Sequence, residues 1–185
     1  MKVVRKGVQP ESYDPEGSVI VVKSKDVGYP EFSLSRCDRT FTTFAEQLQP
    51  GQLLVNMTGK GTIGRSAVVP DFDSDLSVVA AVDVAIVDVD NEQVLPEYLA
   101  LFLNSWMGRY QTRALQTGSS GQQHIYPAHF SEIVIPVEEG SGGTPDLGWQ
   151  RIALVGAAAL TARYTLRRDQ RGPRSVLSPQ SGGGR

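Results

Sequence analysis

Two strand-like runs flank a glycine-rich loop in the segment Gly51-Gln-Leu-Leu-Val-Asn-Met-Thr-Gly59-Lys-Gly-Thr-Ile-Gly64-Arg-Ser-Ala-Val-Val-Pro70. Glycines at positions 59, 61 and 64 permit positive φ angles and close approach by another molecule. Lys60, Thr62 and Arg65 add two cations and a hydroxyl to the loop, a combination that suits a phosphate-rich partner. Nucleic acid is therefore the first partner that the sequence indicates.

The same loop comes close to the nucleotide-binding P-loop pattern, but it departs from that pattern in two ways. Arg65 stands where the P-loop requires a lysine, and residues 67–70 read as a strand rather than as the helix that a P-loop enters. Nucleotide binding is therefore disfavoured. A plain β-hairpin, whose glycines only form the turn, remains an alternative that this segment alone does not eliminate.

The composition describes an ordinary single domain with a real core, because the chain has 185 residues of which 40% are hydrophobic. The first residues carry no apolar run, and no stretch is long enough to cross a bilayer, so we expect a cytoplasmic protein with no membrane partner. Cys37 is the single cysteine, and His124 and His129 are the only histidines. These residues do not suffice for a disulfide framework or a usual zinc site, and we expect no metal and no cofactor.

The charge distribution is uneven along the chain. The net charge of −2 is not the overall signature of a DNA-binding protein. No Lys or Arg lies between Ser66 and Gly108, where eight acids occur, whereas seven arginines and one acid follow Gly148. If the protein binds DNA, it must use local cationic patches and keep an acidic side away from the duplex.

Hydrophobic spacing predicts the main elements. Residues 18–27 read as a strand that ends at Lys23 and Lys25, and residues 78–89 read as one β segment. Residues 96–113 are predicted to form a helix that starts at Pro96, and residues 133–136 a last strand. One helix face is predicted to enter the core through Leu99, Phe102, Leu103, Trp106, Met107 and Tyr110, whereas Arg109 and Arg113 project from other faces.

The C-terminal part divides the chain into four segments. We expect a domain over 1–137, a Gly/Ser-rich linker over 138–145, a helix over 146–171 capped by Asp146, and a disordered tail over 172–185. The apolar row of the helix suits close approach by a second helix, and it is formed by Ile152, Val155, Ala159, Ala162 and Leu166. A helix folded back onto its own domain is the alternative.

The order of these features resembles the target recognition domain of the specificity subunit of type I restriction-modification systems, with related domains in adenine-specific DNA methyltransferases. The resemblance spans roughly residues 18–166. The matching pieces are the strand ending near Lys25-Asp26, Gly51-Gln-Leu-Leu with Gly59 to Arg65, Leu95-Pro-Glu-Tyr-Leu99, Asn104-Ser-Trp-Met-Gly108, Gly118-Ser-Ser-Gly-Gln-Gln-His-Ile125, Phe130-Ser-Glu-Ile-Val-Ile-Pro136 and Gln150-Arg-Ile152.

The resemblance implies a reader of one half of a split double-stranded DNA target. It implies an α+β fold, with a twisted, mostly antiparallel and barrel-like sheet, packed helices and one C-terminal helix. It also implies a specificity subunit or half-subunit that directs a methyltransferase (M) subunit, with a restriction (R) subunit as a further partner, in anti-phage defence. The chain holds one recognition domain where the usual member has two. It must therefore pair with itself, for example through the C-terminal helix, pair with another reader, or be a separated fragment.

Candidate DNA contacts follow from charge and hydrogen-bonding capacity together with the resemblance. Lys60 and Arg65 suit phosphates, whereas Arg36, Arg39 and the Gln122-Gln123 pair suit base edges, because arginine pairs with guanine and glutamine with adenine. The full expected set is Lys23, Lys25, Arg36, Arg39, Lys60, Thr62, Arg65, Arg113, Ser119, Ser120, Gln122, Gln123 and His124.

Catalysis is not expected from this chain. It has no Pro-Pro pair of the kind that adenine methyltransferases use, and no lysine follows Lys60 to complete a nuclease site with Asp71, Asp73 and Asp75. Two classes remain, a DNA reader and a protein-interaction module with the same fold that has lost DNA contact. The reader predicts that Lys23, Lys25, Lys60, Arg65 and Arg113 converge near residues 118–124.

Overall fold

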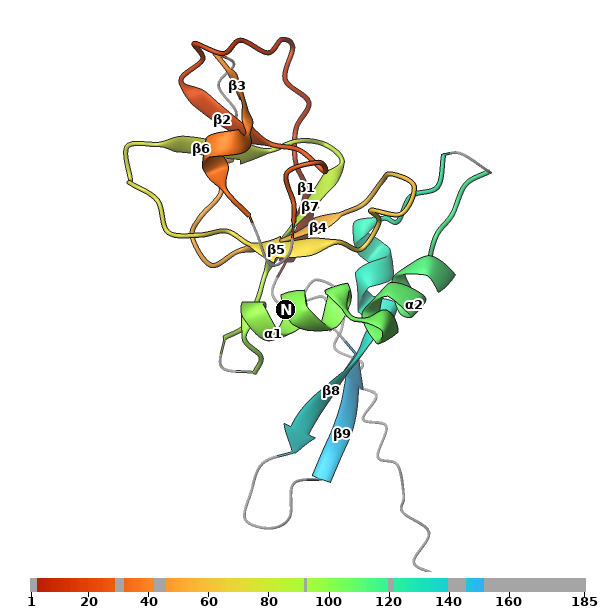
Figure 1. Cartoon of the computed structure of the whole chain (residues 1–185). Coiled ribbons are helices and arrows are strands. Elements are labelled where there is room, and N and C mark those ends of the chain that lie inside the picture. Colours follow the sequence, from red (N-terminus) through yellow and green to blue (C-terminus); the bar gives the residue numbers. More distant parts are fainter. Residues whose placement is uncertain are drawn as a thin grey trace, which may run out of the picture.

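The chain forms layers, with a four-stranded sheet between a three-stranded sheet and a pair of helices (Figure 1). The computed structural model describes residues 3–28, 32–41, 46–91, 93–119, 122–139 and 146–151. Its elements are β1 (Val3–Lys6), β2 (Val19–Val22), η1 (Leu34–Arg36), β3 (Asp38–Thr40), β4 (Leu53–Asn56), β5 (Ser66–Val68), β6 (Ser77–Ala80), β7 (Val84–Asp88), α1 (Pro96–Asn104), α2 (Trp106–Ala114), η2 (Pro127–Glu132), β8 (Val134–Glu139) and β9 (Asp146–Arg151). The fold is α+β, as predicted, and the sheets in the described ranges are open rather than closed into a barrel.

The central sheet has the order β1-β7-β4-β5 and is antiparallel throughout. Both of its faces are covered, which explains why the first three residues of β4, Leu53 to Val55, are all apolar and buried instead of alternating with polar residues. Leu53 and Val55 face the helices, whereas Leu54 packs into a second cluster shared with the three-stranded sheet. Each such side chain contributes about 1.5–3 kcal/mol when it is fully buried.

The three-stranded sheet has the order β3-β2-β6, in which β2 and β6 run parallel. The single strand predicted over residues 78–89 is wrong, because β6 and β7 belong to different sheets. The chain turns between them, where the Val84 N–H donates to the carbonyl of Ala81 at 3.0 Å. Asp83 in this turn accepts bonds from two other segments, from Ser24 N–H to its carboxylate and from Met57 N–H to its carbonyl. These bonds join the two sheets at one end.

The helix predicted over residues 96–113 starts at Pro96 as expected but is broken at Ser105. Ser105 has an extended backbone, with φ −67° and ψ 166°, and its hydroxyl accepts a bond from Gly108 N–H, which starts α2. Gly108 is required at this corner, because a Cβ there would lie 2.2 Å from the carbonyl oxygen of Phe102. The break rotates α2, so Trp106 and Tyr110 are exposed, contrary to the predicted core face.

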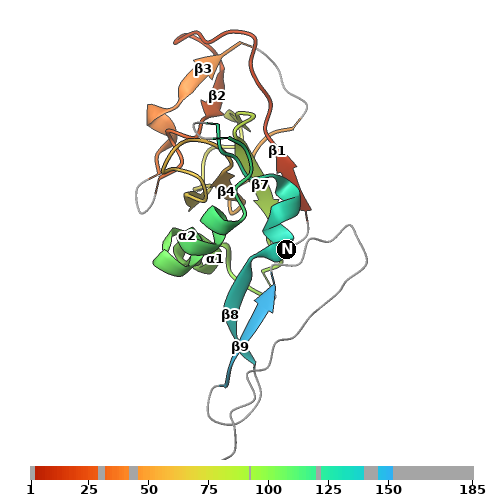
Figure 2. The ribbon, with the colours of Figure 1, turned by 90° about the vertical axis from the view of Figure 1, so that its right-hand side faces the viewer.

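Strands β8 and β9 form an antiparallel ribbon that extends away from the rest of the molecule in two perpendicular views (Figures 1 and 2). The helix predicted to start at Asp146 is therefore wrong over residues 146–151, where pairing with β8 overrides the local helical pattern. Residues 152–185, including the expected partner-helix row and the tail, lie outside the described residues. At the base of the ribbon, the side-chain amide of Gln111 pairs with both Val134 backbone groups and closes that edge.

Candidate nucleic-acid interface

The glycine-rich loop joins β4 to β5 as a hairpin, as the sequence predicts. Gly59, Gly61 and Gly64 all have positive φ, at 94°, 79° and 80°. The carbonyl of Gly59 accepts bonds from the N–H groups of Thr62 at 3.1 Å and Ile63 at 3.3 Å. The hydroxyl of Thr62 also donates within the loop, to the carbonyls of Thr58 and Gly59. Thr62 therefore stabilises the turn, whereas Lys60 is exposed at its tip.

Helix α2 holds this loop from one side. A Cβ at Gly64 would lie 2.5 Å from the hydroxyl of Thr112, so only glycine permits the loop to pack this closely on the helix. One turn earlier, Arg109 donates from Nη2 to the carbonyl oxygen of Gly61. The loop is therefore fixed to α2 both by packing and by a hydrogen bond.

The amide-rich loop after α2 lies beside the glycine-rich loop. His124 forms isolated β-bridges with both Thr117 and Thr58, and Ile125 N–H donates to the carbonyl of Met57 at 2.9 Å. His124 Nδ1 lies 3.1 Å from the carbonyl oxygen of Gln122, and because a carbonyl only accepts, Nδ1 carries the proton. Its other ring nitrogen, when unprotonated, accepts from the Tyr126 hydroxyl. These bonds fix the position of the imidazole.

Three arginines gather where these segments meet. Burial lowers the pKa of Arg109, and the nearby positive charges of Arg65 and Arg113 lower it further. Among the described residues, none of the three forms a salt bridge. Like charges without a counter-charge repel one another, and a bound polyanion would relieve that repulsion.

The backbone around Lys23 and Lys25 lies close to the glycine-rich loop, but the two ammonium groups pair with an acidic side chain instead of adding free charge there. The Asn56 amide at the end of β4 donates to the carbonyl of Ser24 at 2.7 Å, which places the turn beside the strand that enters the glycine-rich loop. Both lysines nevertheless pair with Asp38, at 2.6 and 3.0 Å. Hydrogen bonds from them hold the pKa of Asp38 below its ordinary value. Burial opposes the charge of Lys23, but contacts with Asp38 and Tyr13 outweigh it and raise its pKa.

The remaining expected residues divide between the two ends of the molecule. Arg36 ends η1 and Arg39 lies in β3, both at the three-stranded sheet, and Arg39 donates to the carbonyl of Gly17 at 3.2 Å. Ser119, Gln122 and Gln123 are exposed on the amide-rich loop, and Ser120 lies outside the described residues. The structure therefore brings one subset together on the two loops and α2, namely Lys60, Arg65, Arg113, Ser119, Gln122, Gln123 and His124. We call this surface, together with Arg109, the loop face.

Arg109 was missing from the expected contact set, although it was predicted to project from a face other than the core face. The informative signal was the Arg109/Arg113 pair at i, i+4, which places two cations on one side of a helix. Trp106 and Tyr110 were assigned to the core by the same helical spacing. The serine at position 105 could have indicated the break, because serine is a common N-cap and a new helix after it would restart the helical spacing of apolar residues.

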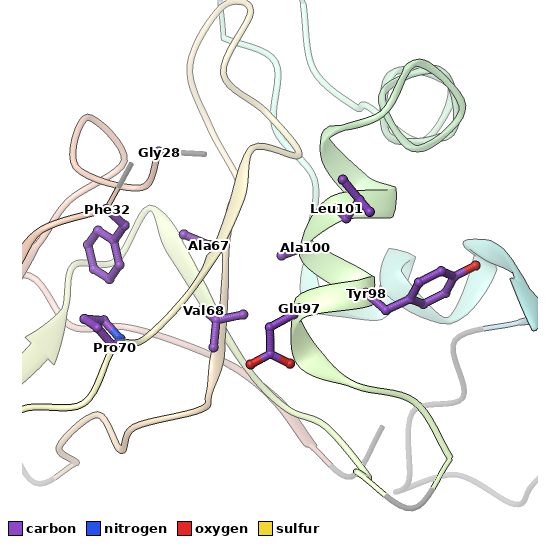
Figure 3. Close-up of a pocket in the computed structure, with 9 residues that line it drawn as sticks. All are labelled: Gly28, Phe32, Ala67, Val68, Pro70, Glu97, Tyr98, Ala100 and Leu101. Atoms are coloured by element: carbon purple, nitrogen blue, oxygen red, sulfur yellow. The ribbon is translucent and has the colours of Figure 1, made fainter. Parts of the chain in front are cut away.

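A separate pocket of about 630 Å³ lies between the edge of β5 and α1 (Figure 3). Its wall is mostly apolar, with Phe32, Val68 and Leu101 among its residues. Glu97 borders the pocket, whereas Tyr98 points away from it and donates to the carbonyl of Pro136. No Lys or Arg is among the described residues that line this pocket, so they offer a polyanion no site comparable to the loop face.

The described residues include neither a metal-binding cluster nor a membrane-spanning helix. No cluster of three or more His, Cys, Asp or Glu side chains there is arranged to hold a metal ion. No helix in the same part of the chain has the length and apolar character needed to span a bilayer.

Comparison with known proteins gives a structural similarity but no match by sequence. The sequence matches no family model, and no curated protein matches it significantly. Among solved structures, the chain is similar to the S subunit of a type I restriction-modification system from M. genitalium, with a TM-score of 0.42 and 18% sequence identity. The similarity covers 68% of this chain and 29% of that chain, so this chain spans less than a third of the S subunit's length.

Proposed function

We propose that this chain recognises a specific double-stranded DNA sequence through the loop face, as a specificity subunit or half-subunit of a restriction-modification system. The observation that carries the proposal is the gathering of Arg65, Arg109 and Arg113, without acidic partners among the described residues, beside two adjacent loops. Cations that converge beside flexible polar side chains distinguish a DNA reader from an interaction module whose charges are scattered.

The loop face divides into parts suited to different tasks. The arginines and Lys60 provide phosphate contacts, which fix the position and register of the protein on a duplex. The amide-rich loop carries Gln122 and Gln123, whose exposed side chains can pair with adenine in the major groove. The bridge between His124 and Thr58, with the bond from Ile125 N–H to the Met57 carbonyl, holds this loop against the glycine-rich loop, so that both tasks are carried out in one orientation.

Partners supply the chemistry and the second half of the target. The sequence lacks the residue patterns of a methyltransferase or nuclease, so catalysis would come from M and R subunits. A second copy of this chain, paired through the row of residues Ile152, Val155, Ala159, Ala162 and Leu166, would provide the second reader. Such a system would act in defence against phage, on DNA inside the cell, which would place the protein in the cytoplasm.

Selection from a randomised duplex library tests this function directly. The full chain is used with and without a cognate methyltransferase subunit, and bound duplexes are sequenced. We expect one short motif to be enriched, and glutamine substitution of Arg65 to weaken binding to it. Absence of enrichment under both conditions would refute sequence recognition and favour the interaction module.

A further inference from the structure

The outward face of α2 carries two exposed aromatic side chains next to the loop face. Trp106 is 78% exposed and Tyr110 is 72% exposed, the two highest values among the large hydrophobic side chains described. Large aromatic side chains normally bury their surface, because each hides 150–250 Å² when it is covered. Their exposure, four residues apart on one helix, therefore indicates a surface that another molecule covers.

The aromatic pair shares its face with two arginines of the loop face. At 3.6 residues per turn, Trp106, Arg109, Tyr110 and Arg113 fall within an arc of about 100° around α2. The buried residues of α2 are Gly108, which lies on the opposite side of the helix, and Thr112, which packs against Gly64 beside this arc. Arg109 reaches Gly61 in the glycine-rich loop. The surface is therefore continuous from that loop across the arginines to the aromatic rings.

The charge of this face selects the kind of partner. The segment Trp106–Ala114 contains two arginines and no acidic residue. Alternating cations and aromatic rings suit a nucleic acid, because guanidinium groups hold phosphates while rings stack on bases, and every base has a face that can stack. In a fully paired duplex, however, neighbouring bases cover those faces. Only a base outside the stack can offer one.

We propose that the outward face of α2 binds unpaired nucleotides in DNA held at the loop face, with Trp106 and Tyr110 stacking on bases and Arg109 and Arg113 holding their phosphates. This inference rests on the proposed DNA-recognition function and names a substrate class, DNA with a locally opened duplex. Opening a base pair costs a few kcal/mol. Stacking on aromatic side chains offsets that cost in part, so α2 stabilises the opened form.

Binding to matched DNA forms tests the proposal. A mixed-sequence duplex, the same duplex with a short unpaired stretch, and the single strand are titrated by fluorescence anisotropy. We expect the wild-type chain to prefer the partly unpaired duplex by about tenfold. Trp106→Ala and Tyr110→Ala should remove most of that preference and leave affinity for the paired duplex nearly unchanged, whereas Trp106→Phe should retain part of it.

Leu101→Ala is the matched control, because Leu101 is 52% exposed on α1 and is not flanked by arginines on its own helix. It should leave the preference intact, and thermal melts confirm that each variant is folded. Equal affinity of the wild-type chain for paired and partly unpaired duplexes overturns the inference and leaves the proposed function standing. Failure to bind any DNA form refutes both. If Trp106→Ala leaves all DNA binding unchanged but prevents binding of the methyltransferase subunit, the face docks protein and the inference is wrong.

Discussion

Arg109 donates a hydrogen bond to the carbonyl oxygen of Gly61, 48 residues earlier in the sequence. The bond joins α2 to the tip of the glycine-rich loop. It also orients a guanidinium whose pKa is lowered by burial and by the charges of Arg65 and Arg113. One side chain thus has two roles, since it positions the loop and contributes charge to the loop face.

Two substitutions at Arg109 separate these roles. Arg109→Lys keeps the charge but loses the planar donor geometry that reaches Gly61, so duplex affinity should fall about threefold with an unchanged salt dependence. Arg109→Gln removes the charge, so affinity should fall about tenfold and the slope of log K against log salt should become shallower by about 0.9. Binding isotherms at several salt concentrations give both quantities. Identical slopes for the wild type and Arg109→Gln would show that Arg109 contacts no phosphate.

Alanine substitution at two glycines of the glycine-rich loop should lower the free energy of unfolding by different amounts. Gly61 has φ 79° with open space around it, so Gly61→Ala should cost only backbone strain, about 1 kcal/mol. Gly64 has φ 80° and also contacts Thr112, so Gly64→Ala should lower the free energy of unfolding by about 2–4 kcal/mol. Urea denaturation measures the difference. Equal costs at the two positions would contradict the close packing of the loop on α2.

The edge of β5 depends on the side chain of Asn104. Its amide nitrogen donates to the Ser66 carbonyl at 2.8 Å, and its oxygen accepts from Ser66 N–H at 3.3 Å, which replaces a missing neighbouring strand. Asn104→Leu leaves these groups unpaired and should destabilise the fold by about 2 kcal/mol. Asn104→Asp keeps only the acceptor and should give a destabilised fold with faster amide exchange at Ser66. Unchanged stability of Asn104→Leu would show that water satisfies this edge.

Asp38 pairs with two lysines that would otherwise be free to contact DNA under the proposed function. Asp38→Asn frees Lys23 and Lys25 beside the loop face, so duplex affinity should rise about threefold and its salt dependence should steepen. Asp73→Asn is the control, because it removes an equal charge from an exposed position that has no salt bridge among the described residues. An equal gain in both variants would mean that overall charge, rather than release of the lysines, causes the effect.

The stability contributed by Asp38 should depend on pH in a defined direction. Its pKa is lowered in the fold from 3.8, so its contribution is present above pH 3.8 and disappears as pH falls through the lowered value. The carboxylate is partly exposed, and the contribution should stay under about 1 kcal/mol. The difference in unfolding free energy between the wild type and Asp38→Asn, measured from pH 7 down to acid, should therefore be constant and then vanish. A difference that grows toward low pH would contradict this pairing.

Local chemistry made part of this fold predictable. Glycines flanked by apolar runs predicted the β4–β5 hairpin, because positive φ is a property of the residue itself. Pro96 marked the start of α1, because the fixed φ of proline suits the first position of a helix. The break between β6 and β7 was not predictable, because it depends on bonds from distant Ser24 and Met57 to Asp83.

Contacts between distant segments determined the elements that local sequence patterns predicted wrongly. Residues 146–151 carry a pattern compatible with a helix, yet they pair with β8. Trp106 and Tyr110 fit the helical spacing of α1, but the cap at Ser105 starts a second helix with a different buried side. Among the expected contact residues, the placement of Lys60, Gln122 and Gln123 on exposed loops was predictable from their chemistry. The engagement of Lys23 and Lys25 by Asp38 was not, because it joins the segment after β2 to the start of β3.

The most direct test of the loop face is the salt dependence of duplex binding by a variant that combines Arg65→Gln, Arg109→Gln and Arg113→Gln. If the three arginines act together on phosphates, the slope of log K against log salt should become shallower by nearly three, at about 0.9 for each contact. A folded triple variant that binds duplex DNA with the wild-type slope would contradict the account.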